Sequence, residues 1–208
     1  MQRVVLGVLN FVFAVAMVAP VSGQILISEI ADPGDDTDGR FVELYNYSDQ
    51  TIDMAAENWV LEAQVNGGSS FPTENLTGTL APGDYHIIGR TEIRFNNAYG
   101  FFPDQSNGSV VNSNGNEAYF LYQGGTGGTL IDQYGERNVD GSGEPWEFEN
   151  SQVQRAQGPA NSTFTIGEWD ITAADVADMN PGSNPNESSL PVELATFTAQ
   201  VNGPQAQL

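Results

Sequence analysis

An acidic loop near the start of the chain is the part of the sequence most suggestive of chemistry. Four aspartates fall within one short stretch, namely Asp32, Asp35, Asp36 and Asp38. Calcium takes about six to eight oxygen ligands from carboxylates, carbonyls and water, so the loop predicts a calcium site. The EF-hand pattern does not fit, because aligning it on residues 36–39 puts Gly34 at the first ligand position and Tyr45 at the last. A solvated turn rich in Asp and Gly is the alternative.

Nucleophilic catalysis is not indicated. The chain has no cysteine and one histidine, His86, which excludes thiol catalysis and argues against a transition-metal site. No Gly-x-Ser-x-Gly elbow accompanies His86, since residues 141–143 (GSG) lack that spacing. The surrounding alternation predicts a strand residue, half buried or at a sheet edge. A chain with 27 acidic residues offers chance carboxylate pairs of the kind that glycosidases use. A second acidic group, Asp140, Glu144, Glu147 and Glu149, is a weaker candidate for a cation, with a solvated loop as the alternative. We therefore expect no enzymatic activity and no cofactor other than calcium.

Aromatic side chains are the remaining candidates for ligand contact. Trp59 alternates in phase with Leu61 and is expected in the core. Trp146 lies beside Pro145 and Gly143 in a Gly-rich stretch, so it is predicted to be exposed and available to a ligand. The glycine run at residues 124–128 sits between two predicted strands rather than before a helix, which indicates a hairpin turn and not a phosphate cradle.

The elements that position these residues are predicted to be short β-strands. Gly, Asn, Asp, Ser and Pro recur about every ten residues and separate runs that alternate or are β-branched and aromatic, a spacing typical of a sandwich or barrel. In one such run Val42 and Leu44 share a face opposite Glu43. One short helical turn is expected near residues 91–98. The predicted strands are residues 24–30, 40–46, 59–65, 84–90, 118–122, 130–134, 152–155 and 168–171.

The two ends of the chain differ from this β-rich middle. Residues 1–23 contain Arg3, an uncharged apolar run and small residues after Pro20, the pattern of a secretory signal peptide. A membrane anchor is the alternative. Residues 24–180 are predicted to form the sandwich, and residues 181–189, with their Pro, Gly and Ser, a linker. Residues 190–208 contain another alternating stretch, interpreted as a C-terminal strand that starts a truncated following domain.

The net negative charge of the chain argues against anionic partners. The chain has 27 acidic and 6 basic residues, a net charge of −21, and every basic residue is Arg. Such a surface repels phosphate backbones and anionic headgroups, so neither nucleic acid nor, after signal cleavage, a membrane is an expected partner. The acid excess fits solubility outside the cell or adaptation to high salt, where screening weakens self-repulsion.

Several motifs in order resemble bacterial lamin-tail domains. The opening resembles the family's first strand, D-P turn and E-F-[IV]-E-L-Y-N strand, with Arg40 in place of the first acidic residue. Met54 and Asn58 likewise replace the usual Leu and Gly of a later segment. The matching segments are ILISEI (25–30), DPGDDTDG (32–39), RFVELYN (40–46), TIDMAAENWVL (51–61), LAPGDYHIIG (80–89), NGNEAYFLY (114–122), TLIDQYG (129–135), GEPWEFENSQVQRA (143–156), STFTIGEWDI (162–171) and MNPGSN (179–184).

The resemblance implies an immunoglobulin-like β-sandwich. The arrangement of Trp146, Arg155 and Trp169 is most similar to secreted proteins of Bacteroidota-type bacteria. The segment LPVELATFTAQ at residues 190–200 resembles one that often precedes a C-terminal type IX sorting domain there, so the chain is expected either to end early or to be a fragment of a larger architecture.

We therefore expect a non-catalytic binding or adhesion module that is secreted or displayed at the cell surface, with the periplasm as the alternative location. Its expected partner is a protein or polysaccharide at the cell surface. One alternative is a structural subunit or spacer that self-associates through edge strands. Another is the accessory domain of a secreted hydrolase whose catalytic part lies outside this chain. Fold alone does not decide among these.

Overall fold

The structure is a computed structural model that describes residues 25–156 and 158–184. The predicted signal peptide at 1–23, most of the predicted linker and the predicted strand within 190–208 lie outside the described residues. In the described ranges, no helix has the length and apolar character needed to cross a membrane.

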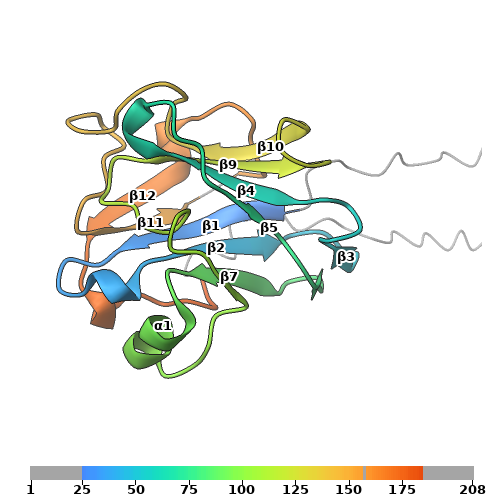
Figure 1. The fold of residues 1–208 in the computed structure, drawn as a ribbon, viewed down its shortest axis with the longest axis horizontal. Helices are drawn as coiled ribbons and strands as arrows, with labels where there is room; N and C mark the ends of the chain where they lie inside the picture. Colours follow the sequence, from blue (N-terminus) through green and yellow to red (C-terminus); the bar gives the residue numbers. More distant parts are fainter. Residues whose placement is uncertain (1–24, 157, 185–208) are drawn as a thin grey trace, which may run out of the picture.

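The larger of two facing sheets joins the start and the end of the described chain. Its strand order is β12-β11-β1-β2-β7-β8. Neighbours are antiparallel except β7 and β8, which run parallel. Strand β1 therefore lies at the centre of the sheet (Figure 1). The strands are β1 (Ile25–Asp32), β2 (Phe41–Asn46), β7 (Tyr85–Gly89), β8 (Gln105–Ser106), β11 (Ser151–Arg155) and β12 (Trp169–Ala173).

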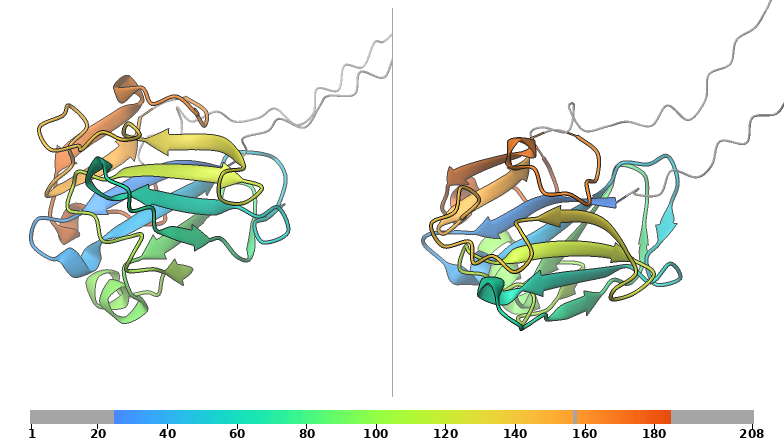
Figure 2. Two further views of the ribbon diagram at one scale, coloured as in Figure 1. Left: turned by 45° about the horizontal axis from the view of Figure 1, so that its top comes forward. Right: turned by 90° about the horizontal axis from the view of Figure 1, so that it is seen from above.

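The smaller sheet packs across the larger one, and the two appear as separate layers in Figure 2. Its order is β10-β9-β4-β5, and all of its pairs are antiparallel. Residues 124–128 form the turn between β9 and β10, as the glycine run predicts. The strands are β4 (Val60–Gln64), β5 (Thr73–Asn75), β9 (Ala118–Gln123) and β10 (Thr129–Tyr134), with β3 (Ile52–Asp53) and β6 (Thr79–Leu80) as a separate pair.

The hydrophobic core fills the space between the sheets. Val42 and Leu44 belong to the main buried cluster and Glu43 does not, as their alternation predicts. Trp59 also lies in this cluster, with only 1% of its surface exposed. Asn58 has φ 52° where the resembled pattern has Gly, and Asn is one of the few residues that tolerates this left-handed region.

A buried ion pair ties the two sheets together. Asp132 of β10 and Arg155 of β11 have fully buried side chains, and the guanidinium binds both carboxylate oxygens at 2.6 and 2.7 Å. Both also bond the backbone of Ile27 in β1, where Asp132 accepts from the N–H and Arg155 donates to the carbonyl. The Arg155 guanidinium stacks 4.2 Å from the Trp169 ring. Each charge therefore has the partners that burial requires.

Helix α1 (Glu92–Tyr99) covers one end of the outer face of the larger sheet. The Thr91 hydroxyl caps its first turn, and Gly100, with φ 82°, ends it. Phe95 packs edge-on against Phe41 of β2, with ring centroids 5.8 Å apart. This is the predicted short helix. The 3₁₀ turns are η1 (Thr37–Gly39), η2 (Val65–Gly67), η3 (Ile166–Glu168) and η4 (Val176–Asp178).

The prediction of an all-β sandwich is confirmed, and each predicted strand overlaps an observed one. The short strands β3, β5, β6 and β8 had no clear sequence signal, because two or three residues are too few to show a period. The sandwich also extends past the predicted boundary at residue 180. Gly182 and Asn184 hydrogen bond to β2 and β1, respectively, so residues 181–184 pack on the larger sheet.

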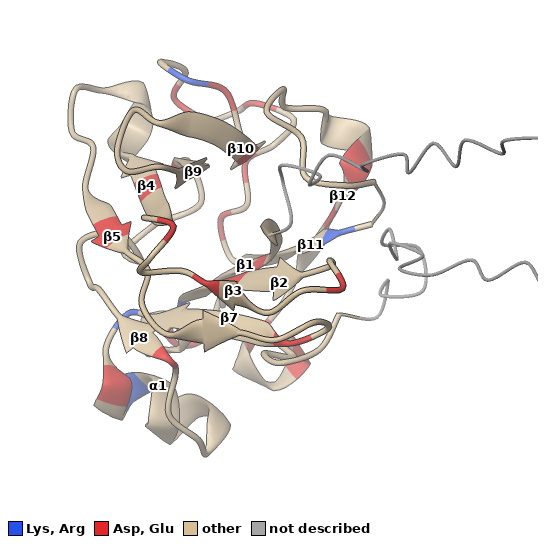
Figure 3. Cartoon of the chain, turned by 90° about the vertical axis from the view of Figure 1, so that its right-hand side faces the viewer, with Lys and Arg blue, Asp and Glu red and all other residues tan. Residues whose placement is uncertain are grey.

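Acidic residues are spread over strands and loops, with few basic residues among them (Figure 3). Of the arginines, Arg40, Arg90 and Arg94 all pair with aspartates of the predicted calcium loop. Three of the five arginines within residues 25–184 therefore lie beside the loop that was predicted to bind a cation.

Candidate functional site

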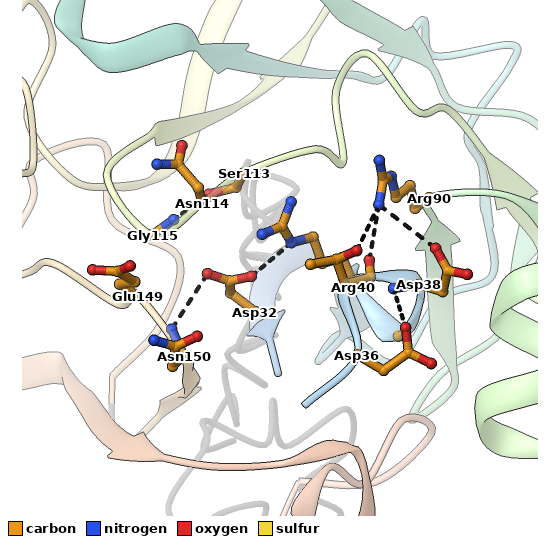
Figure 4. Close-up of polar contacts among 12 residues, drawn as sticks. Asp32, Asp36, Asp38, Arg40, Arg90, Ser113, Asn114, Gly115, Glu149 and Asn150 are labelled. Atoms are coloured by element: carbon orange, nitrogen blue, oxygen red, sulfur yellow. Dashed lines mark hydrogen bonds and ion pairs between the residues drawn. The ribbon is translucent and has the colours of Figure 1, made fainter. Parts of the chain in front are cut away.

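The acidic loop connects β1 to β2 and contains η1 (Figure 4). Asp32 ends β1 and is buried, whereas Asp35, Asp36 and Asp38 follow at the surface. The Asp36 carboxylate accepts a hydrogen bond from the Asp38 N–H at 2.8 Å and so caps η1. Asp35 accepts from the backbone N–H of Val176 at 2.8 Å. The loop is thus held by its own carboxylates.

Arginines take up the remaining carboxylates of the loop. The Asp32 carboxylate lies 2.6 Å from Arg40 Nε, and Asp38 pairs with Arg94 and lies 3.6 Å from Arg90. Burial raises the pKa of Asp32, and the Arg40 guanidinium works against that rise. In the described part of the chain, no three Asp, Glu or His side chains come together in a group suited to a metal ion. The calcium site stays a prediction, and binding there would have to displace the arginines.

Trp146 is not exposed, and that prediction is wrong. Its side chain is 2% exposed and belongs to the main core. The ring packs edge-on against Tyr134 at 6.1 Å between centroids. A side chain on Gly135 or Gly141 would overlap the indole, at 2.9 and 2.6 Å. The neighbouring glycines therefore make room for a buried ring, and Trp146 has no face for a ligand.

The second acidic group stabilises its own loop. Asp140 accepts from Asn116 Nδ2 at 2.9 Å and from the Ser142 N–H at 3.1 Å, and Glu147 accepts from the Gly143 N–H at 2.9 Å. These contacts close the long connection between β10 and β11 and do not form a carboxylate cluster.

A polar pocket lies at the β7 side of the larger sheet and was not predicted. Its volume is about 540 Å³, which falls within the range of small-ligand sites. Its walls come from β6, from β7 and the turn before it, from Asp104, and from Gly182 near the end of the described chain. No Lys or Arg is among its described lining residues, so the pocket is negatively charged.

The polar groups of the pocket are partly committed to the fold. Asp104 Oδ2 accepts from the Ile87 N–H at 2.8 Å, which fixes this carboxylate against the edge of β7. Asp84 is exposed. His86 is 5% exposed and lies 3.0 Å from Gln105 Oε1. Burial lowers the pKa of His86, which favours the neutral imidazole and leaves two carboxylates as the charges of the pocket.

The lining shows why sequence reasoning missed the pocket. Asp84, Tyr85 and His86 are adjacent in the sequence, but Asp104 and Gly182 reach the pocket only through folding. His86 lies in a strand as predicted, but it is buried, at 5% exposure, rather than half buried or at a sheet edge. The alternation that identified its strand carried no sign of the cavity beside it.

Comparison with known proteins identifies one family. A family model described as Lamin Tail Domain matches residues 19–138. The match spans the loop, both sheets up to β10, and most of the pocket, but not Gly182. No curated protein matches the chain.

Proposed function

We propose, on the premise that the chain belongs to the lamin tail domain family, that it is a secreted, non-catalytic module that binds a polysaccharide at the cell surface. The all-β immunoglobulin-like fold of this family positions loops and pockets on a rigid sandwich. The single observation that carries the proposal is the polar pocket beside β7. The apolar run and small residues of positions 1–23 support secretion.

The chemistry of the pocket favours a hydroxyl-rich ligand without negative charge. Asp84 and Asp104 present carboxylate oxygens, which accept hydrogen bonds from hydroxyls. Tyr85 also lines the pocket, and its ring packs against Tyr45 at 4.9 Å between centroids. A net charge of −21 repels anionic polymers. Neutral or cationic polysaccharides are therefore the ligand class we propose.

The contacts of the pocket support binding rather than catalysis. One oxygen of Asp104 is held by the Ile87 N–H, and His86 is buried and paired with Gln105. A general base must reach its substrate at about 2.6–3.2 Å, and the buried imidazole is oriented toward a neighbouring side chain instead.

The test is binding of the secreted chain to neutral polysaccharides, measured by affinity electrophoresis and calorimetry. We expect Asp84→Asn and Asp104→Asn to weaken binding about tenfold each, since each removes a charged acceptor worth about 1.5 kcal/mol or more. Asp170→Asn is the matched control, because it removes the same charge from exposed β12 at the opposite edge of the sheet.

Retention of full affinity in both pocket variants would reject the pocket as the binding site. Concentration-dependent oligomers without polysaccharide binding would favour the structural subunit that pairs through edge strands. Binding to a surface protein but to no polysaccharide would reject polysaccharides as the ligand and retain the proposal that the chain is a binding module.

A further inference from the structure

Two glutamates lie side by side on the outer face of the larger sheet. Glu29 of β1 and Glu43 of β2 are direct cross-strand partners, and both are fully buried. Like charges directly opposite each other destabilise a sheet. Their burial is unexpected on the face that points away from the main core.

The cover segment, residues 180–184, lies over this pair. The Gly182 N–H donates to Glu43 Oε2 at 2.5 Å. Gln152 of β11 donates both to Glu29 Oε1, at 2.7 Å, and to Asn180 Oδ1. Asn184 Nδ2 donates to the Ser28 carbonyl at 3.3 Å. The two glutamates are therefore linked to the cover segment directly and through one glutamine.

One carboxylate oxygen in this cluster has no partner. Glu29 Oε2 is buried without a hydrogen bond. An ionised carboxylate with an unpaired buried oxygen is strongly disfavoured. Burial accordingly raises the pKa of Glu29 to about 7, against the lowering effect of Gln152, Gln154 and the Asn180 backbone. Near neutral pH, a modest change in acidity changes the charge of this group.

The groups around Glu29 do not supply a compensating positive charge. On β2 it faces Glu43, and on β11 the neutral amides of Gln152 and Gln154. From α1, Tyr99 is close enough that the Glu29 charge helps to raise its pKa. The cover segment contains no charged residue. Ionising Glu29 therefore places a second negative charge beside Glu43 beneath this segment.

We propose that Glu29 and Glu43 form a proton-dependent latch on the cover segment. With Glu29 protonated, the segment lies closed over the pair. With Glu29 ionised, repulsion and the need to hydrate the carboxylates lift residues 180–184 away from the sheet. Gly182 also lines the polar pocket, so opening removes part of a pocket wall. That consequence for affinity rests on the proposed function, whereas the latch itself does not.

The test is amide hydrogen exchange of the cover segment in the secreted chain from pH 5 to pH 9, normalised to the intrinsic rate at each pH. We expect opening at Gly182 to increase on the order of 50-fold between pH 5 and 8 and to level off above. Glu29→Gln, which cannot ionise, is expected to stay closed throughout. Glu136→Gln, at an exposed loop position, is the matched control and should behave as wild type.

The wild-type profile tests the latch even if a variant fails to fold. Protection of Gly182 that is constant with pH in the wild type overturns the latch, as does a pH dependence that Glu29→Gln retains. Polysaccharide binding is measured separately at pH 5. Its absence there would reject the proposed function and leave the latch standing, whereas binding with constant protection would reject only the latch.

Discussion

Replacing Glu29 by Gln should stabilise the protein, and increasingly so as the pH rises. The folded pKa of Glu29 is about 7 against an ordinary value of 4.5, so the stability linked to its proton is fully present below about pH 4.5 and is lost as the pH rises to about 7. At about 1.36 kcal/mol for each unit of pKa, the whole rise corresponds to about 3 kcal/mol, of which about 2.5 falls between pH 5 and 8. We expect Glu29→Gln and wild type to be similar at pH 5.

The assay is urea denaturation of both proteins at several pH values, followed by tryptophan fluorescence. Taking the difference between the two proteins at each pH cancels the titration of groups that do not interact with Glu29. A constant difference, or one that favours wild type at pH 8, would refute the reasoning. The stability advantage of Glu29→Gln could also rise by less than about 2.5 kcal/mol while exchange at Gly182 becomes faster in wild type. That result would mean that opening of the cover segment reduces the free-energy cost of ionising Glu29.

Other changes probe the core, the backbone and the acidic loop. Asp132→Asn removes the carboxylate that Arg155 binds through both oxygens and leaves this fully buried arginine only the Glu168 carboxylate at 3.3 Å. A loss of about 3 kcal/mol is expected in urea denaturation; a loss below about 1 kcal/mol would contradict it. Gly115→Ala puts a Cβ 2.1 Å from the Glu149 backbone nitrogen at φ 99° and should prevent folding, as judged by circular dichroism. Gly124→Ala, at φ 85° with open space around it, should lose only about 1–2 kcal/mol. If the acidic loop binds calcium, Ca²⁺ raises the Tm and the double variant Asp36→Ala, Asp38→Ala abolishes the rise; an unchanged wild-type Tm would remove the site.

Local patterns were enough to predict most of the fold. Strands such as β2 can be predicted because alternate residues face the core, and Val42 and Leu44 are therefore apolar at alternating positions. The helix near Thr91 and the turn at residues 124–128 follow from capping and glycine chemistry, which act over a few residues. Each of these signals depends on neighbours along the chain, and a single sequence contains that information.

Local patterns did not predict the environment of side chains on the face of a strand that points away from the main core. Glu43 is polar at a position that alternation assigns to the surface, yet it is fully buried. It is covered by residues about 140 positions later, through the bond from the Gly182 N–H. Trp146 shows the same error for an aromatic side chain, since the glycines beside it suggested an exposed loop and instead accommodate its buried ring.

The all-β class of the protein can be inferred from the amino-acid sequence, because strand periodicity, turn residues and charge are local or additive properties. Which polar groups lie together depends on the folded arrangement. It paired the aspartates of the predicted calcium loop with three arginines, joined Asp132 to Arg155, and placed Asp104 and Gly182 in one pocket. These encounters depend on how the two sheets pack and on where the last described residues cross the larger sheet. Contacts between residues far apart in the sequence depend on the whole folded chain, and they leave no periodic signal in any segment of the sequence.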